Sequence, residues 1–225
     1  MQKIIIFGFP HSGTSILKSI IGHIEEVCEI ISETHIIDDK YTRSGKKYVL
    51  CKTPYTRADI FSDTYKDYIK IFIIRNPLWV FSSLNKRFLN NIPSKCDVAE
   101  YIKSAEKFAY YRKNKAKNLY LIRYEDMFEN NYQYLRAIFE SIGLIYTDAI
   151  FDNKNYLNKI KDNIDTPQEK PPNTDHDKYR TYQINQEFVN NNDIDNLDLT
   201  VEQKKILLTQ PTILEIYPDI NKIIT

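Results

Sequence analysis

A run of small and polar residues near the N-terminus has the composition of an anion-binding turn. Gly8 and Gly13 stand five positions apart, as in the phosphate loops of nucleotide-binding proteins. Backbone N–H groups of such a turn point at an anion, and the dipole of the following helix attracts negative charge. Ser12 and Thr14 add hydroxyl donors. Taken alone, the pattern also fits a turn that binds nothing.

Two departures separate this turn from the loop of a nucleoside triphosphatase. Such a loop carries a lysine that meets the β- and γ-phosphates, and this chain has Thr14 there. The apolar run Ile71 to Ile74 ends in Arg75, at a point where a triphosphatase strand supplies an acidic metal ligand. Both departures argue against the hydrolysis of ATP or GTP.

The elements that must position these residues follow from apolar patterning. Short apolar runs predict strands over Lys3–Phe9, Val27–Ile31, Tyr48–Lys52, Ile69–Ile74 and Asn118–Arg123. Helical patterns cover Thr14–His23, Arg57–Tyr68, Pro77–Phe88, Asp97–Lys115, Tyr132–Ile142 and Thr200–Leu208. Strands that alternate with helices predict a three-layer α/β fold with a mainly parallel sheet of about five strands, like that of the P-loop nucleotide kinases.

The domain organisation follows from the same pass along the chain. The 225 residues predict one domain, with a core over about 1–145 and a C-terminal helical part over about 150–225. Between them, Asp152 to Asp177 is rich in Asn, Lys, Asp and Pro and predicts a long loop.

Composition excludes several classes of function. Lys plus Arg total 31 and Asp plus Glu total 30, so the net charge of +1 gives no general reason to expect a nucleic-acid or membrane-surface partner. The chain has three cysteines, none of them in a C-x-x-C pair, which argues against a disulfide framework and a zinc site. Reduced thiols fit a cytoplasmic location. The apolar run Ile4–Phe7 is too short for a signal-peptide core or a membrane span.

Three motifs together resemble the sulfotransferases that use 3′-phosphoadenosine-5′-phosphosulfate (PAPS). Phe9 to Leu17 looks like their 5′-phosphosulfate loop, P-[KR]-S-G-T-[TS]-x-L. The segment Ile74 to Ser83 looks like their 3′-phosphate motif, in which R-[ND]-P is followed by a serine eight residues after the arginine. Arg123 to Asp126 resembles their R-Y-E-D stretch. The agreement in order and spacing runs from Lys3 to about Gly143.

The resemblance implies a donor site for PAPS, with 3′-phosphoadenosine-5′-phosphate (PAP) as product and no metal. Arg75 offers a fork of donors to the 3′-phosphate, and Ser83 on the following helix can face the same pocket. Each taken singly could be an ordinary salt-bridge arginine or helix serine. The residues expected to bind the donor are His11, Ser12, Gly13, Thr14, Ser15, Arg75 and Ser83.

Catalytic candidates come from a second pair of resemblances. Glu33 to Asp38 resembles the E-x-H-x-x-D segment of the carbohydrate branch, especially the heparan sulfate 3-O-sulfotransferases, and Lys52-Thr53-Pro54 resembles their K-[TS]-P segment. The resemblance implies Glu33 as base, His35 as its orienting partner and Asp38 as the residue that fixes the His35 tautomer. It implies Lys52 as the cation that stabilises developing negative charge. His35 is the alternative base, and a solvated loop is the alternative interpretation of the segment.

His11 is the main departure from the family, which has Lys or Arg at this position to assist the leaving group. An imidazole can do so only when protonated or as a neutral N–H donor. We therefore expect Lys52 to carry more of this role or activity to depend on pH. A relative that only binds nucleotide stays open, as does a P-loop kinase or triphosphatase.

The acceptor is the least defined part of the prediction. We expect a small-molecule or carbohydrate hydroxyl, and the sequence leaves the oligomeric state open. The helix from Asp97 carries Tyr101, Tyr110 and Tyr111, which either line an acceptor groove or pack on the domain. The basic segment Lys178-Tyr179-Arg180 is a weaker candidate for covering the donor.

Overall fold

The computed structural model of the chain describes residues 1–30, 33–38, 41, 45–54, 58–89, 91–152 and 197–223. The predicted loop after Asp152 and the basic segment Lys178-Tyr179-Arg180 lie outside these residues. Whether residues 1–225 form one domain therefore stays a prediction.

A five-stranded parallel sheet forms the centre of the fold, in the order β2-β3-β1-β4-β5. Its strands are β1 (Gln2–Gly8), β2 (Val27–Glu29), β3 (Tyr48–Thr53), β4 (Ile69–Ile74) and β5 (Leu119–Arg123). The register pairs Ile6 with Lys52 and Gly8 with Ile73. The end of β1 thus lies between the ends of β3 and β4, which matches the predicted fold class.

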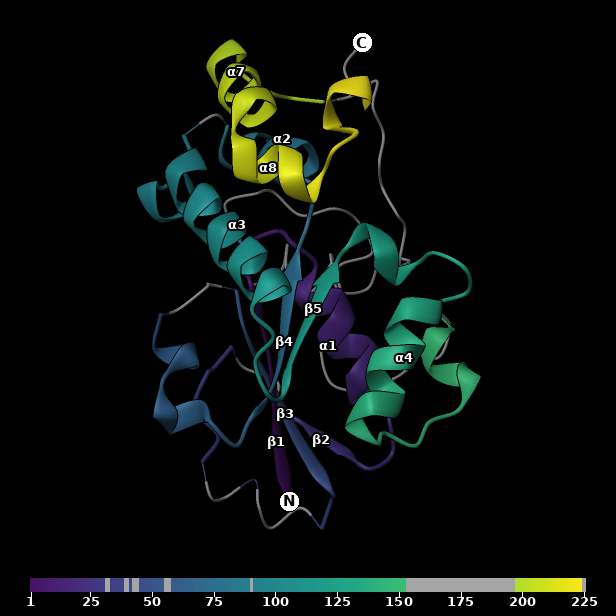
Figure 1. The fold of residues 1–225 in the computed structure, drawn as a ribbon. Helices are drawn as coiled ribbons and strands as arrows, with labels where there is room; N and C mark the ends of the chain where they lie inside the picture. The colour runs from purple at the N-terminus through teal and green to yellow at the C-terminus, as the bar shows by residue number, and fades with distance from the viewer. Residues whose placement is uncertain are drawn as a thin grey trace.

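Helices cover both faces of the sheet (Figure 1). Helices α1 (Thr14–Gly22) and α4 (Gln133–Ile142) pack on one face, and α3 (Val98–Lys113) packs on the other with the 3₁₀ turns η2 (Ala58–Phe61) and η3 (Asp63–Tyr65). Beyond the carboxyl ends of the strands lie α2 (Pro77–Phe88), α7 (Val201–Thr209) and α8 (Pro211–Ile216). Four more 3₁₀ turns are η4 (Ser94–Cys96), η5 (Glu125–Met127), η6 (Asp148–Phe151) and η7 (Ile220–Ile223).

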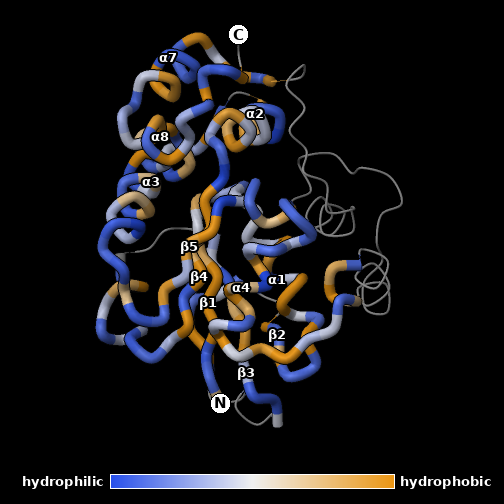
Figure 2. The backbone as a smooth tube through the Cα atoms, turned by 45° about the vertical axis from the view of Figure 1, so that its right-hand side comes forward, coloured by the Kyte–Doolittle hydropathy of each residue, from blue (hydrophilic) through white to orange (hydrophobic). Residues whose placement is uncertain are grey.

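The strands are apolar on both faces because both faces are covered. Ile4 and Ile6 of β1 point to the layer of α1 and α4, whereas Ile5 and Phe7 point to the layer of α3. All four side chains are fully buried. Figure 2 shows this hydrophobic character concentrated along the strands in the centre of the molecule.

Helix ends agree with the cap residues in the sequence. Asp97 accepts a hydrogen bond from the Glu100 N–H at the start of α3, and Gly143 ends α4 in a left-handed conformation. Thr200 and Gln203 form the predicted capping box of α7. These helices and the five strands confirm the prediction to within a few residues.

The helix predicted over Arg57–Tyr68 is wrong. The chain instead forms η2 and η3. Between them, the Ser62 N–H and Ser62 hydroxyl both donate to the Asp59 carbonyl, at 2.9 and 2.6 Å. Such local bonds offer the backbone an alternative to a continuous helix. Helix α8, which starts with Pro211, was not predicted.

Candidate functional site

The turn after β1 is held in a conformation that suits an anion site. Its backbone passes through the left-handed region at His11 (φ 65°) and Gly13 (φ 93°), and α1 begins directly after it. A Cβ on Gly13 would lie 2.3 Å from Cδ2 of Tyr124, so only glycine fits. The Ser12 side chain is fully buried, and its Oγ has no hydrogen-bond partner among the described residues. A buried hydroxyl without a partner is costly, and an anion in the turn would satisfy it.

Lys52, at the end of β3, joins two of the predicted residues. Its Nζ lies 2.6 Å from Oε1 of Glu33 and donates to Oγ of Ser15 at 2.7 Å. The Lys52 side chain is 5% exposed and the Glu33 side chain 29% exposed. The ammonium is therefore buried at the start of α1 while the carboxylate reaches solvent. This arrangement brings the predicted base and the predicted cation together.

Burial controls the protonation of Lys52. Desolvation, and second the neighbouring Lys18 ammonium, lower the pKa of Lys52 to about 7, and Glu29 opposes them. The Glu33 carboxylate at 2.6 Å also opposes them, because an opposite charge favours the ammonium form. Lys18 is itself paired with Glu29 at 3.0 Å. A lysine with a pKa near neutrality can change charge within the working pH range.

The segment after Glu33 runs beside the end of β3. The Thr34 N–H donates to the Lys52 carbonyl at 3.0 Å, and the Thr34 hydroxyl accepts from the Ile36 N–H at 3.1 Å. His35 is half-buried and Asp38 is exposed. The backbone bond to β3 fixes Glu33 near Lys52, whereas the roles predicted for His35 and Asp38 stay predictions.

A second group of predicted residues forms on the other side of the turn. Nδ1 of His11 lies 2.7 Å from Oγ of Ser83 on α2, and NH1 of Arg75 approaches the His11 carbonyl at 3.5 Å. The Arg75 guanidinium stacks over the Tyr124 ring, 4.4 Å from its centroid. The Tyr101 hydroxyl donates to the Arg75 carbonyl at 2.7 Å. The loop and the Arg75/Ser83 pair, far apart in sequence, are thus in contact.

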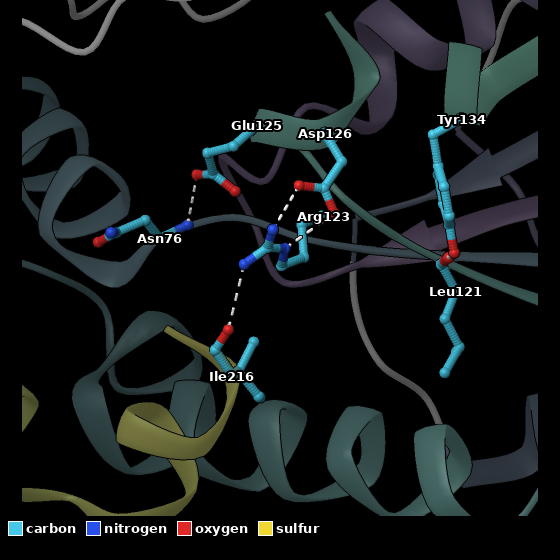
Figure 3. A network of polar contacts seen from close by, with 7 residues as sticks. All are labelled: Asn76, Leu121, Arg123, Glu125, Asp126, Tyr134 and Ile216. Atoms are coloured by element: carbon cyan, nitrogen blue, oxygen red, sulfur yellow. Dashed lines mark hydrogen bonds and ion pairs between the residues drawn. The ribbon is translucent and has the colours of Figure 1, made fainter. Parts of the chain in front are cut away.

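The R-Y-E-D stretch contacts Asn76, the residue after Arg75 (Figure 3). Oε1 of Glu125 accepts the Asn76 N–H at 2.8 Å. Arg123 pairs with Asp126, its Nε donating at 2.8 Å, and its NH1 donates to the Ile216 carbonyl at 3.3 Å. Burial raises the pKa of the Glu125 carboxyl, which the Asn76 N–H opposes. This stretch therefore joins β5 to the start of α2 and to the end of α8.

A cavity of about 720 Å³ opens beside the turn, on the α3 face of the sheet. Phe9 and Pro10 reach it from the turn, and the stacked rings of Phe61 and Tyr111, 4.5 Å apart, form part of its wall. Its charged lining residues are Lys95, Glu100, Lys103, Glu106 and Lys107. Tyr110 also lines it, whereas Tyr101 lies in the core. Tyr110 and Tyr111 thus line a cavity and Tyr101 packs in the core, whereas a role of the cavity as an acceptor groove stays a prediction.

Two basic residues of the site were not singled out from the sequence. Lys18 lies one helical turn after Ser15, and Arg87 lies one turn after Ser83, so each shares a helix face with a predicted residue. NH1 of Arg87 is 3.4 Å from Nε2 of His11. Helical spacing from a predicted site residue could have identified both.

The described residues contain no group of three or more His, Cys, Asp or Glu side chains that could hold a metal ion. None of their helices has the length and apolar character needed to cross a membrane.

Comparison with known proteins gives a similarity of fold. No protein-family model and no curated protein matches the chain. Among solved structures, it is similar to mouse sulfotransferase SULT7A1 in complex with PAP, with a TM-score of 0.57 and 19% identity. The match covers 91% of this chain and 81% of the mouse chain. The chain therefore has the α/β fold of that sulfotransferase.

The pKa of Lys52 predicts how stability changes with pH. A lysine of pKa about 7 in the folded state and 10.5 when unfolded takes up a proton on unfolding between these values, so its contribution to stability rises with pH. We expect the free energy of unfolding of the wild type, minus that of Lys52→Met, to increase from pH 7 to pH 9. Urea unfolding at each pH measures this difference.

Lys66→Met, at an exposed position, is the matched control for this experiment. The difference in the free energy of unfolding between the wild type and Lys66→Met should stay constant from pH 7 to pH 9. A Lys52→Met difference that is equally flat would show that Lys52 titrates normally, in contradiction to the effect of burial.

Proposed function

We propose that this protein is a sulfotransferase that moves a sulfonyl group from PAPS to an acceptor hydroxyl. The observation that carries the proposal is the contact between the turn at His11 and the Arg75/Ser83 pair, at the carboxyl ends of the strands. The similarity to a sulfotransferase that binds PAP supports it.

The residues present fit the donor. Ser12 offers a buried hydroxyl without a described partner, and Gly13 keeps the turn open beside Tyr124. The backbone N–H groups at the start of α1, with Thr14 and Ser15, would hold the 5′ end. Arg75 and Ser83 would hold the 3′-phosphate. When bound, PAPS supplies the sulfonyl group that is transferred.

Glu33 is the proposed base and Lys52 its cationic partner. Their contact at 2.6 Å places the Glu33 carboxylate, the group that would accept a proton from an acceptor hydroxyl, beside the Lys52 ammonium. Lys52 also bonds to Ser15 of α1, so its charge lies beside the phosphate turn. His35 remains the alternative base, and Asp38 would fix its tautomer.

The cavity beside Phe9 is the proposed acceptor site. Its aromatic wall suits the C–H face of a sugar ring or a flat aromatic ring, and its three lysines outnumber its two glutamates. We propose a carbohydrate or small-molecule hydroxyl as acceptor. The similarity to SULT7A1 gives no particular support to the heparan sulfate 3-O branch. The choice of a sugar therefore rests on the set Glu33, His35, Asp38 and Lys52, together with the aromatic wall of the cavity. A cytoplasmic location is supported by the free state of Cys28, Cys51 and Cys96.

Two alternatives make different predictions. A P-loop kinase or triphosphatase would bind ATP with magnesium, but Thr14 occupies the position of the required lysine. A non-catalytic relative would bind PAP and transfer nothing.

Donor binding tests the proposal first. We expect PAP to raise the melting temperature of the wild type, because a ligand that binds only the folded state stabilises it by about 2.7 kcal/mol at 100 times its Kd. Arg75→Ala should lose this shift, and ATP with magnesium should give none. Arg112→Ala, at an exposed position on α3, is the control and should respond like the wild type. A larger response to ATP than to PAP would favour the kinase.

Turnover tests the role of Glu33. We expect Glu33→Gln to lower kcat by about 10²- to 10⁴-fold, the usual contribution of a general base, while PAP affinity stays unchanged. Formation of PAP from PAPS is followed with glycans, phenols and amines as acceptors, using the first that the wild type accepts. Glu140→Gln, on the exposed side of α4, is the control.

Full activity in Glu33→Gln would show that Glu33 is not the base and would favour His35 in that role. A wild type that binds PAP but accepts none of these compounds would support the non-catalytic relative.

A further inference from the structure

The imidazole of His11 is held between two groups of α2. Its Nδ1 lies 2.7 Å from Oγ of Ser83, and its Nε2 lies 3.4 Å from NH1 of Arg87. A guanidinium has donors only, so Nε2 must accept in this contact. The tautomer that fits both contacts carries its proton on Nδ1 and donates it to Ser83.

The same arrangement sets the role of Ser83. Because its Oγ accepts from His11, its own hydroxyl proton can be donated to an anion. Arg87 stands four residues after Ser83 on α2, so both side chains lie on one face of the helix. Arg87 is half-buried, and its guanidinium lies 5.3 Å from the Phe88 ring. The guanidinium of Arg87 on α2 thus lies beside His11, the residue that replaces the usual Lys or Arg of the turn.

We propose that Arg87 is a further binding residue for the 3′-phosphate of the donor. The inference rests on the proposed function. A phosphate monoester carries roughly two negative charges near neutral pH, and Arg75 alone would offset about half of this. Arg75, which precedes α2, and Ser83 and Arg87 on α2 would all contact this phosphate. Arg87 also fixes the tautomer through which His11 orients Ser83.

Nucleotides that differ only in their phosphates separate the two ends of the site. Calorimetric titrations would compare PAP, adenosine 3′-monophosphate and adenosine 5′-monophosphate on the wild type and Arg87→Gln. We expect Arg87→Gln to bind PAP and the 3′-monophosphate about 10- to 100-fold more weakly, as for the loss of a charge-assisted hydrogen bond. Its affinity for the 5′-monophosphate should be unchanged.

Lys86→Gln is the matched control, because Lys86 precedes Arg87 on α2 and its side chain is exposed. We expect this variant to bind all three nucleotides like the wild type. A loss in Arg87→Gln that is limited to the 5′-monophosphate would place Arg87 at the other end of the donor and overturn the assignment.

A charge-conserving substitution tests whether Arg87 acts as a cation or as packing. Arg87→Lys keeps the positive charge on α2 and should retain most of the PAP affinity that Arg87→Gln loses. An Arg87→Lys variant that is as weak as Arg87→Gln, with an unchanged melting temperature without ligand, would contradict the charge role.

Failure of this inference is distinguishable from failure of the proposed function. If the wild type binds PAP through Arg75 and Arg87→Gln binds it equally well, only the role of Arg87 is wrong. If the wild type binds no PAP, the proposed function itself is wrong.

Discussion

The position of β1 between β3 and β4 is the constraint on which the candidate site depends. Parallel pairing sets Ile6 beside Lys52 and Gly8 beside Ile73, so the turn after β1 emerges between the ends of its two neighbours. A Cβ at Gly8 would lie 2.2 Å from the Ile73 carbonyl, which shows how closely β1 and β4 approach there. This strand order brings Lys52 to one side of the turn and Arg75 to the other. A donor with charged groups at both ends needs such a two-sided arrangement.

The positive charges on the two sides of the turn are stabilised by different contacts. On the β3 side, Lys52 is buried with a pKa lowered to about 7, and Glu33 and Ser15 compensate the buried ammonium. On the β4 side, the guanidinium of Arg75 stacks over the Tyr124 ring. Buried charge of this kind costs stability unless it is paired. The large apolar layers on both faces of the sheet offset that cost.

The sequence predicted the strands and most helices because apolar periodicity and cap residues are local signals. It also predicted Glu33, Lys52, Arg75 and Ser83 through motifs, but it could not show which of them touch. The contact between Glu33 and Lys52 depends on the register of β3, and the contact between His11 and Ser83 depends on the order of β1 and β4. The contact of Arg87 with His11 needs both the strand order and the rotation of α2. The failed helix at Arg57–Tyr68 has a local cause, because the Ser62 N–H and the Ser62 hydroxyl both donate to the Asp59 carbonyl there.

A crystal structure of the protein with PAP tests most directly whether one donor spans both sides of the turn. We expect the 5′-phosphate to lie against the N–H groups from Gly13 to Ser15, and the 3′-phosphate to contact Arg75 and Ser83. The adenosine would then connect the two groups at the carboxyl edge of the sheet. PAP bound elsewhere, or bound with its 3′-phosphate away from Arg75, would contradict the donor site proposed for this protein.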